Sequence, residues 1–195
     1  MRREDLEAIA KVLKDTNIMI ASDEIYSELT YSGKHCSIAE IEGMRERTIV
    51  INGFSKSFAM TGWRLGFLGG PKEIVSQMLK LHQYAIMSSP TVSQYAAIVA
   101  MHSCQKDIDA MRNEYNIRRR FVVDSFNKLG LKCFAPQGAF YVFPCIKSTG
   151  MTSTDFCEKL VYTKKVAVVP GDAFGECGEG YVLSLIHISE PTRPY

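Results

Sequence analysis

Apolar and polar residues follow two different periods in the first part of the chain. Residues 1–14 place apolar side chains three or four positions apart among charged ones, which predicts an amphipathic helix. Three later segments are short, mostly apolar runs: 17–23 (NIMIASD), 48–53 (TIVING) and 64–70 (RLGFLGG). Such runs are typical of parallel strands that are buried on both faces. We therefore expect three parallel strands here.

Helical periods return after the third of these strands. We expect helices over 72–82 and about 92–103, so that strands alternate with helices. This alternation predicts an α/β fold with helices packed on a mostly parallel sheet. A longer helix is expected over about 106–129, with Gly130 as the residue that ends it.

The pattern beyond residue 130 changes character and predicts a smaller α+β unit over 131–182. Its expected elements are two short strands in LKCFAPQGAFYVFP around a Pro136–Gly138 turn, a helix over 153–162 capped by Thr152 or Ser153, a strand at VAVVP and a loop at GDAFGECGEG. No linker of low complexity separates this unit from the first.

Composition narrows the class of protein. The chain has 195 residues, of which 46% are hydrophobic and 23% charged, as in ordinary globular proteins. A net charge of +2 is too small to indicate binding to nucleic acid or to a membrane surface. No apolar run reaches the roughly 18 residues that span a bilayer. The six cysteines lack CxxC spacing, so we expect free thiols in a reducing cytoplasm and no metal site.

Chemically useful side chains gather where the predicted strands end. The segment 53–66, GFSKSFAMTGWRLG, holds Lys56 and, eight positions later, Arg64. The first strand ends at Asp23, with Tyr26 three residues on. Ligands of open α/β sheets bind beyond the carboxyl ends of the strands. If the strands are neighbours, these four side chains converge at one edge of the sheet.

This set of side chains suits pyridoxal 5′-phosphate. The Lys56 amine can form a Schiff base with the aldehyde and later carry the proton at the substrate Cα. Asp23 would pair with the pyridinium nitrogen, and Tyr26 would hydrogen-bond the phenolic oxygen of the ring. Arg64 and Ser55 would bind the phosphate. In the same loop, we expect glycine at position 62 to allow a close approach of the backbone.

The segment 53–66 resembles the lysine-attachment pattern of class I/II aminotransferases throughout its length. SDEIY (22–26) is similar to the aspartate-and-tyrosine strand end of that family, whereas GAFY (138–141) and VPG (169–171) resemble its small-domain substrate-facing loops. The resemblance covers about 1–182. It implies the fold of PLP-dependent transferase fold type I: an α/β large domain with a small α+β domain.

The resemblance also implies a function. Members of this family move an amino group from an amino acid to a 2-oxo acid in two half-reactions, and the resemblance also implies a homodimer. The stretch 83–97 resembles the part that reaches toward the partner subunit. Two alternatives remain open: a PLP-dependent C–S β-lyase of the same fold, and a truncated product without activity.

Three departures from the family pattern bear on the last alternative. Gly53 stands where many relatives place a serine that contacts phosphate. The family's glycine-rich phosphate loop and ring-stacking aromatic residue have no counterpart, so we expect a fragment that lacks the N-terminal half and is inactive alone. The run 183–195, LSLIHISEPTRPY, resembles translated sequencing adapter, with Leu183 in place of the family's carboxylate-binding arginine and Arg193 out of register.

These expectations define three parts of the chain. Residues 1–112 are expected to form part of the large PLP-binding domain, and residues 113–182 the interdomain helix with the small domain. Residues 183–195 are expected to be a non-native tail.

Overall fold

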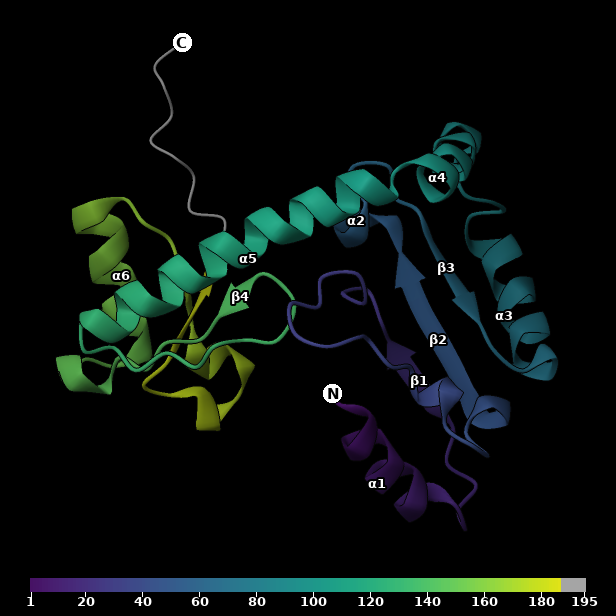
Figure 1. The fold of residues 1–195 in the computed structure, drawn as a ribbon, viewed down its shortest axis with the longest axis horizontal. Helices are drawn as coiled ribbons and strands as arrows, with labels where there is room; N and C mark the ends of the chain where they lie inside the picture. The colour runs from purple at the N-terminus through teal and green to yellow at the C-terminus, as the bar shows by residue number, and fades with distance from the viewer. Residues whose placement is uncertain (187–195) are drawn as a thin grey trace. The chain divides into compact units, whose positions relative to one another are not determined.

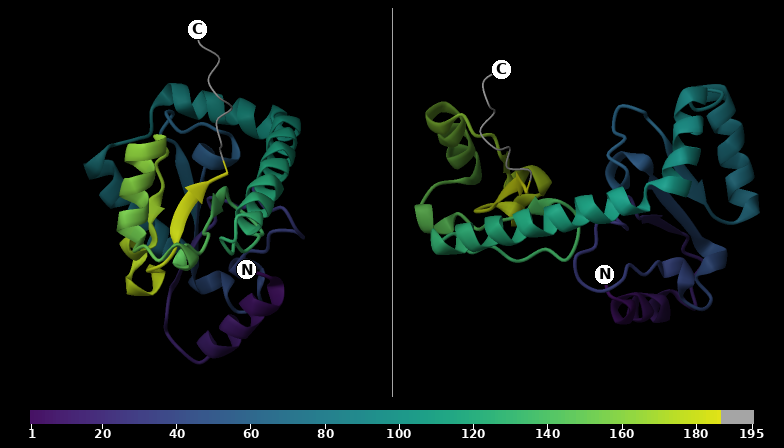
Figure 2. Two further views of the ribbon diagram at one scale, coloured as in Figure 1. Left: turned by 90° about the vertical axis from the view of Figure 1, so that its left-hand side faces the viewer. Right: turned by 45° about the horizontal axis from the view of Figure 1, so that its top comes forward.

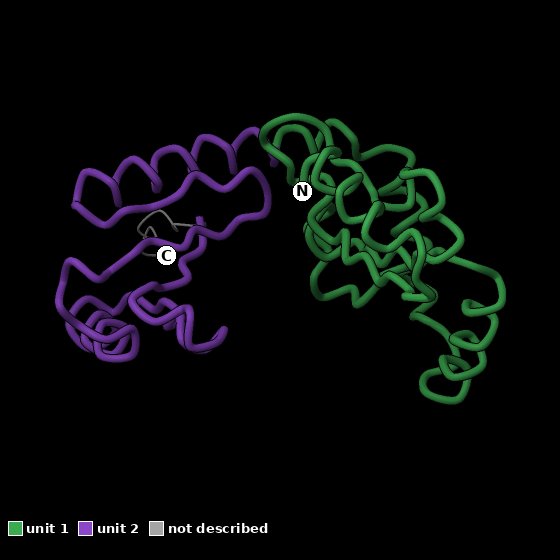
Figure 3. Tube along the Cα trace, turned by 90° about the horizontal axis from the view of Figure 1, so that it is seen from below, with its two compact units in different colours: residues 1–110 green, residues 111–195 purple. Residues whose placement is uncertain are grey.

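The computed structural model describes residues 1–186, and the chain divides into two compact units (Figure 3). The first unit runs from Met1 to Ala110, and the second begins at Met111. The division falls within helix α5 (Gln105–Lys128), close to the boundary expected after residue 112. Each unit has its own core and is described by itself.

The first unit is built on a three-stranded sheet with the strand order β1–β2–β3 (Figure 1). The strands are β1 (Ile20–Asp23), β2 (Thr48–Gly53) and β3 (Gly66–Gly69). β1 and β2 are parallel, with Asp23 opposite Ile51. β2 and β3 are antiparallel, with Gly53 opposite Gly66. The strand expected at 48–53 is thereby confirmed in both of its bounds.

The direction of β3 corrects the prediction of three parallel strands. Between β2 and β3 lie only the helical turn α2 (Phe54–Ser57) and an irregular loop. Parallel strands are usually joined by a crossover that contains a full helix, whereas the helix in this connection is only 4 residues long and the chain turns back on itself. The predicted burial of this strand is also wrong, because all four residues of β3 are exposed and no described strand pairs with its outer edge.

The three helices predicted for this unit are present: α1 (Arg3–Leu13), α3 (Lys72–Ala85) and α4 (Thr91–Ser103). Two 3₁₀ turns, η1 (Ile38–Glu40) and η2 (Arg45–Arg47), precede β2. The apolar face of α1 buries Leu6 and Ala10 against Ile38, Ile41 and Met44. The segment between β1 and β2 is therefore anchored in a core of its own.

The second unit contains a small antiparallel sheet with the order β4–β6–β5. Its strands are β4 (Tyr141–Val142), β5 (Val169–Pro170) and β6 (Val182–Leu185). Helix α6 (Ser153–Lys164) lies beside this sheet (Figure 2), and its Cys157 packs with Ile146 and Val182 in a buried cluster. Short 3₁₀ turns complete the unit: η3 (Lys147–Thr149), η4 (Gly171–Phe174) and η5 (Glu176–Gly178).

Two predicted helix ends in this unit are confirmed. The hydroxyl of Thr152 accepts a hydrogen bond from the backbone N–H of Asp155 at 3.1 Å and caps α6. Gly130 follows α5 with φ +77°, the left-handed conformation that favours glycine. Within residues 1–186, no helix has both the length and the apolar composition that crossing a membrane requires.

Three predictions for the second unit are wrong in detail. Of the strand expected at VAVVP, only Val169–Pro170 is formed. The first half of LKCFAPQGAFYVFP forms no strand, because its backbone binds the side chain of Asn127 instead of a neighbouring strand. The N–H of Cys133 donates to Asn127 Oδ1 at 3.0 Å. GDAFGECGEG, expected as a loop, contains the turns η4 and η5. The last two segments are shaped by contacts that hydrophobic periodicity does not show.

Part of the expected non-native tail belongs to this sheet. Leu183 pairs with Val169, and Ile186 is fully buried with its N–H donating to the carbonyl of Phe140 at 3.0 Å. The remainder, with Arg193, lies outside the described residues, and the origin of the tail stays a prediction.

A buried hydroxyl in the second unit gives a stability prediction. Ser153 Oγ donates to the carbonyl of Tyr181 at 2.9 Å and accepts the N–H of Gly180 at 2.9 Å. In Ser153→Ala this buried N–H loses its partner, so we expect the free energy of unfolding to fall by about 2 kcal/mol. Urea denaturation of the full chain measures the change. The exposed hydroxyl of Ser148 gives the control: Ser148→Ala should change it by less than about 0.5 kcal/mol, and equal losses would contradict the assignment.

Candidate active site

Lys56 lies on the single helical turn at the carboxyl end of β2. This turn, α2, follows directly on Gly53, the last residue of the strand. The chain takes this course because Phe54 is buried against Ala97 and Ala100 of α4. Lys56 itself is half-buried. The predicted lysine is therefore positioned by a strand end and by core packing.

The loop after Lys56 is held in an unusual backbone conformation. Ala59 and Arg64 have φ values of +53° and +49°, in the left-handed region that residues with a Cβ seldom occupy. The buried Ser93 of α4 donates its hydroxyl to the carbonyl oxygen of Trp63 at 2.8 Å. Helix α4 thus holds the residue next to Arg64. Sequence analysis missed Ser93, since one serine in an apolar helix carries no local signal.

Three chain segments meet at Gly53. A Cβ on Gly53 would lie 3.2 Å from the Cα of Gly66, from the Cδ1 of Ile25 and from the carbonyl oxygen of Leu65. The φ angle of Gly53 is −175°, an extended value that any residue adopts, so the backbone conformation does not require glycine. Glycine is needed here because the closely packed neighbouring atoms leave little room for a Cβ. This packing joins the end of β2 to the turn after β1 and to the start of β3.

Asp23 and Tyr26 lie on that turn after β1. Asp23, which is exposed, accepts the N–H of Ile25 on its Oδ1 at 3.1 Å, and Tyr26 is half-buried. The amide of Asn52, near the end of β2, donates to the hydroxyl of Ser27 at 3.1 Å. The turn with Asp23 and Tyr26 and the turn with the lysine are therefore neighbours at one edge of the sheet.

The other three predicted residues flank the lysine. Arg64 is exposed and donates its Nη1 to the carbonyl of Thr61 at 2.8 Å, which leaves further donors of its guanidinium for a ligand. Ser55 is half-buried on α2. A Cβ on Gly62 would meet nothing within 4 Å, so the described protein atoms do not require glycine there. Its role toward a ligand stays a prediction.

A buried carboxylate at this edge is absent from the predicted set. Glu24 is 9% exposed and accepts hydrogen bonds from Ser22 Oγ at 3.0 Å and Ser37 Oγ at 2.6 Å. Its other oxygen lies 2.9 Å from Nε2 of His35. His35 therefore has a buried carboxylate as its partner. Its partner lies eleven positions away in sequence, too far for a local pattern to show.

The bonds to Glu24 predict a pH dependence of stability. Burial alone would raise the pKa of Glu24, but hydrogen bonds from Ser37, His35 and Ser22 outweigh it and lower the pKa. A carboxyl whose pKa is lower when folded stabilises the fold above its unfolded value, roughly 4.3, and loses that contribution as pH falls through the folded value.

We therefore expect the free energy of unfolding to decrease as the pH falls below about 4.3, and to decrease less steeply in Glu24→Gln. Urea denaturation at a series of pH values measures both slopes. Identical slopes for the two proteins would show that Glu24 contributes nothing to the acid sensitivity.

A further buried polar atom lies directly beside the lysine. Ser57 is 2% exposed, and its hydroxyl has no hydrogen-bond partner among the residues that the structure describes. Buried hydroxyls almost always have one. Position 57 is thus a polar site that this part of the chain leaves unsatisfied.

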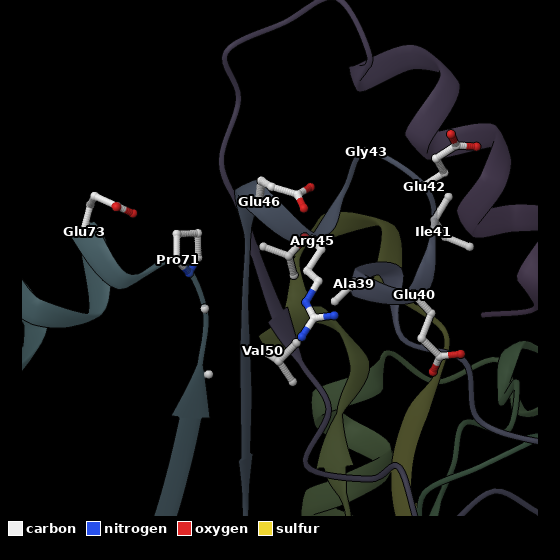
Figure 4. Close-up of a pocket in the computed structure, with 13 residues that line it drawn as sticks. Ala39, Glu40, Ile41, Glu42, Gly43, Arg45, Glu46, Val50, Pro71 and Glu73 are labelled. Atoms are coloured by element: carbon white, nitrogen blue, oxygen red, sulfur yellow. The ribbon is translucent and has the colours of Figure 1, made fainter.

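A hollow of about 1010 Å³ lies at the opposite end of β2 (Figure 4). Thr48 at the start of β2 and Gly69 at the end of β3 line it. Its charged lining residues are Glu40, Glu42, Arg45, Glu46 and Glu73. Four carboxylates against one guanidinium disfavour a phosphate-bearing ligand. The lysine edge is therefore the better candidate for such a ligand.

A comparison with models of protein families shows to which family this chain belongs. The model of the family described as aminotransferase class I and II matches residues 1–182. The chain belongs to this family. The segment 53–66 and the strand end with Asp23 both lie within the matched residues.

Curated relatives of this aminotransferase chain differ in their named substrates. It is 48% identical over 185 residues to the aspartate aminotransferase of Pyrococcus abyssi. It is 47% identical over 185 residues to the aromatic-amino-acid aminotransferase 2 of Thermococcus litoralis. Each match covers 93% of this chain and 48% of the relative. The chain thus spans about half the length of the curated relatives it matches.

Solved structures confirm the predicted fold class. The aromatic aminotransferase from Pyrococcus horikoshii superimposes with a TM-score of 0.93 at 44% identity, covering 97% of this chain and 52% of that one. A double mutant of Thermus thermophilus aspartate aminotransferase gives a TM-score of 0.90 at 34% identity, over 96% and 49% of the two chains. The chain therefore has the fold type I architecture of its family.

Proposed function

We propose that this chain is part of an enzyme that transfers an amino group between an amino acid and a 2-oxo acid with pyridoxal 5′-phosphate. One observation carries the proposal: Lys56 stands on a fixed turn at the sheet edge that also bears Asp23 and Tyr26. Arg64 lies just before β3, and the two residues that follow it, Leu65 and Gly66, pack against Gly53 at the same edge. Membership of the aminotransferase family supports the same chemistry.

The side chains at this edge fit pyridoxal 5′-phosphate by their chemistry. The amine of Lys56 suits the aldehyde, and the guanidinium of Arg64 suits the phosphate. The carboxylate of Asp23 suits the ring nitrogen, and the phenol of Tyr26 suits the ring oxygen. When bound, pyridoxal 5′-phosphate supplies an electron sink for the bonds at the substrate Cα.

Each residue then has a distinct task. Lys56 would hold the aldehyde carbon of the cofactor and would carry the proton at the substrate Cα. Asp23 would keep the ring nitrogen protonated, and Tyr26 would donate its hydroxyl to the ring oxygen. Arg64 and Ser55 would bind the phosphate oxygens.

The crowding at Gly53 suits a phosphate that is held without a side chain at this position. A serine there would press on the backbone of Leu65 and Gly66, since its Cβ would lie 3.2 Å from atoms of both. We therefore assign phosphate binding to Arg64 and Ser55, with no contribution from position 53.

An apolar surface on the first unit supports a homodimer. Many large apolar side chains of α3, of α4 and of the loop between them are exposed, including Tyr84 at 95% and Met87 at 80%. The others are Leu79, Leu81, Ile86, Val92, Tyr95, Ile98, Val99 and Met101. An apolar surface of this kind marks an interface, and it includes the stretch 83–97 expected to face a partner subunit. Six free cysteines suit a reducing cytoplasm.

Product analysis tests the proposed reaction. The parent protein, given pyridoxal 5′-phosphate, an aspartate or aromatic amino donor and a 2-oxo acid, should form equal amounts of oxidised donor and aminated acceptor. Release of pyruvate and sulfide from cysteine without an acceptor would replace the proposal with the C–S β-lyase. For residues 1–195 alone we expect little or no turnover, and steady turnover would contradict the expectation of an inactive product.

A further inference from the structure

We infer that Glu24, His35 and Ser37 form a lock that positions Asp23 and Tyr26, the two ring-binding residues of the proposed function, on which this inference rests. The carboxylate of Glu24 accepts bonds from Ser37 at 2.6 Å and lies 2.9 Å from His35. These three residues are called the lock below. They lie in the first unit, at the carboxyl end of β1.

Glu24 occupies the position where a lock acts most directly. It is the residue after Asp23, and its carbonyl accepts the N–H of Ser27 at 2.9 Å to form the turn that carries Tyr26. Its own N–H donates to the carbonyl of Ile51 at 2.8 Å. Both backbone groups and both carboxylate oxygens of Glu24 are therefore engaged, which leaves this residue little freedom to rotate.

The other side of the lock is anchored independently of the turn. Ser37 also accepts the N–H of Ala39 at 3.2 Å and so caps the 3₁₀ turn η1. The first residue of that turn, Ile38, is buried with Leu6 and Ala10 of α1. The lock thus connects the turn of Asp23 and Tyr26 to the α1 core. Without the lock, that turn would retain only its backbone bonds, the Asn52–Ser27 bond and the packing of Ile25 on Gly53.

Because Glu24 is buried, its carboxylate depends on the hydrogen bonds of the lock. A carboxylate that is 9% exposed is strongly destabilising unless hydrogen bonds replace its water. Removing the histidine donor leaves part of this charge unpaired, so the turn is expected to open toward water. Cofactor-binding groups that act by geometry lose effectiveness when their support loosens by even about 1 Å.

A pair of variants at His35 separates the hydrogen bond from mere packing. His35→Gln keeps an N–H donor that can reach Glu24, whereas His35→Leu removes it. We measure amide hydrogen exchange in the full 1–195 chain for residues 24–29 and, as an internal reference, for β2. In His35→Leu, exchange of 24–29 should accelerate roughly tenfold or more relative to β2, and His35→Gln should restore it.

A destabilised control guards against a general loss of stability. Ser153→Ala lowers stability in the second unit and should leave the ratio of 24–29 to β2 exchange unchanged. Unchanged exchange in His35→Leu, equal acceleration in both segments, or failure of His35→Gln to restore protection would each overturn the lock.

A second readout links the lock to the cofactor. With pyridoxal 5′-phosphate added to the same proteins, the pH midpoint of the absorbance change at Lys56 should shift in His35→Leu but not in His35→Gln or Ser153→Ala. A midpoint common to all proteins would show that the lock does not position the ring-binding residues. Failure of the parent protein to hold the cofactor at Lys56 would overturn the proposed function, whereas the exchange ratios decide whether the lock exists.

Discussion

Replacing Lys56 with alanine is expected to abolish the covalent attachment of pyridoxal 5′-phosphate to this chain. The half-buried turn α2 presents this amine beside the turn of Asp23 and Tyr26, and we assign no second amine to that edge. In any form of the enzyme that turns over, amino transfer should fall by at least about 10²–10⁴-fold, the usual contribution of a positioned proton carrier. Borohydride reduction followed by peptide mapping measures the attachment.

Two matched variants make this prediction specific. Lys72→Ala removes an exposed lysine from the first turn of α3 and should leave attachment unchanged. Lys56→Arg keeps the positive charge but removes the nucleophilic amine, so it should behave like Lys56→Ala. Attachment at Lys72 in place of Lys56, or an arginine variant that retains turnover, would refute the assignment of Lys56.

The parts of this site that the sequence predicted are those with a local signature. The segment TIVING begins and ends where β2 does. A short apolar run that ends at a glycine predicts both the strand and the residue at which it stops. Lys56 follows at a fixed distance from that stop. The position of the lysine was therefore predictable from one segment of the chain.

The parts that the sequence did not predict depend on partners far away along the chain. RLGFLGG has the composition of a buried strand, yet β3 is antiparallel and exposed. Its direction depends on the preceding connection, which contains no full crossover helix. Glu24 has the appearance of one more acid after Asp23. Besides the nearby Ser22, its partners are His35 and Ser37, which belong to no hydrophobic pattern in the sequence. Side-chain hydrogen bonds between distant segments leave no trace in hydrophobic patterning.

Replacing Gly171 with alanine is expected to destabilise the second unit by about 3 kcal/mol, at the upper end of the usual effect of overpacking. A Cβ on Gly171 would collide with the carbonyl oxygen of Gly178 and lie 2.7 Å from that of Tyr181. Both obstacles are backbone atoms, so no side chain can move aside. Gly178 is equally confined, because its own Cβ would collide with the carbonyl oxygen of Gly171.

Thiol labelling of the buried Cys157 during urea denaturation measures this loss, because Cys157 belongs to the core of the second unit. Gly69→Ala is the control: its Cβ meets nothing within 4 Å, so stability should stay the same or rise slightly. If Gly171→Ala labels no faster than the control, the backbone contact is not a constraint. If it labels faster, the glycine of the VPG segment is required by packing, whatever further part it plays toward a substrate.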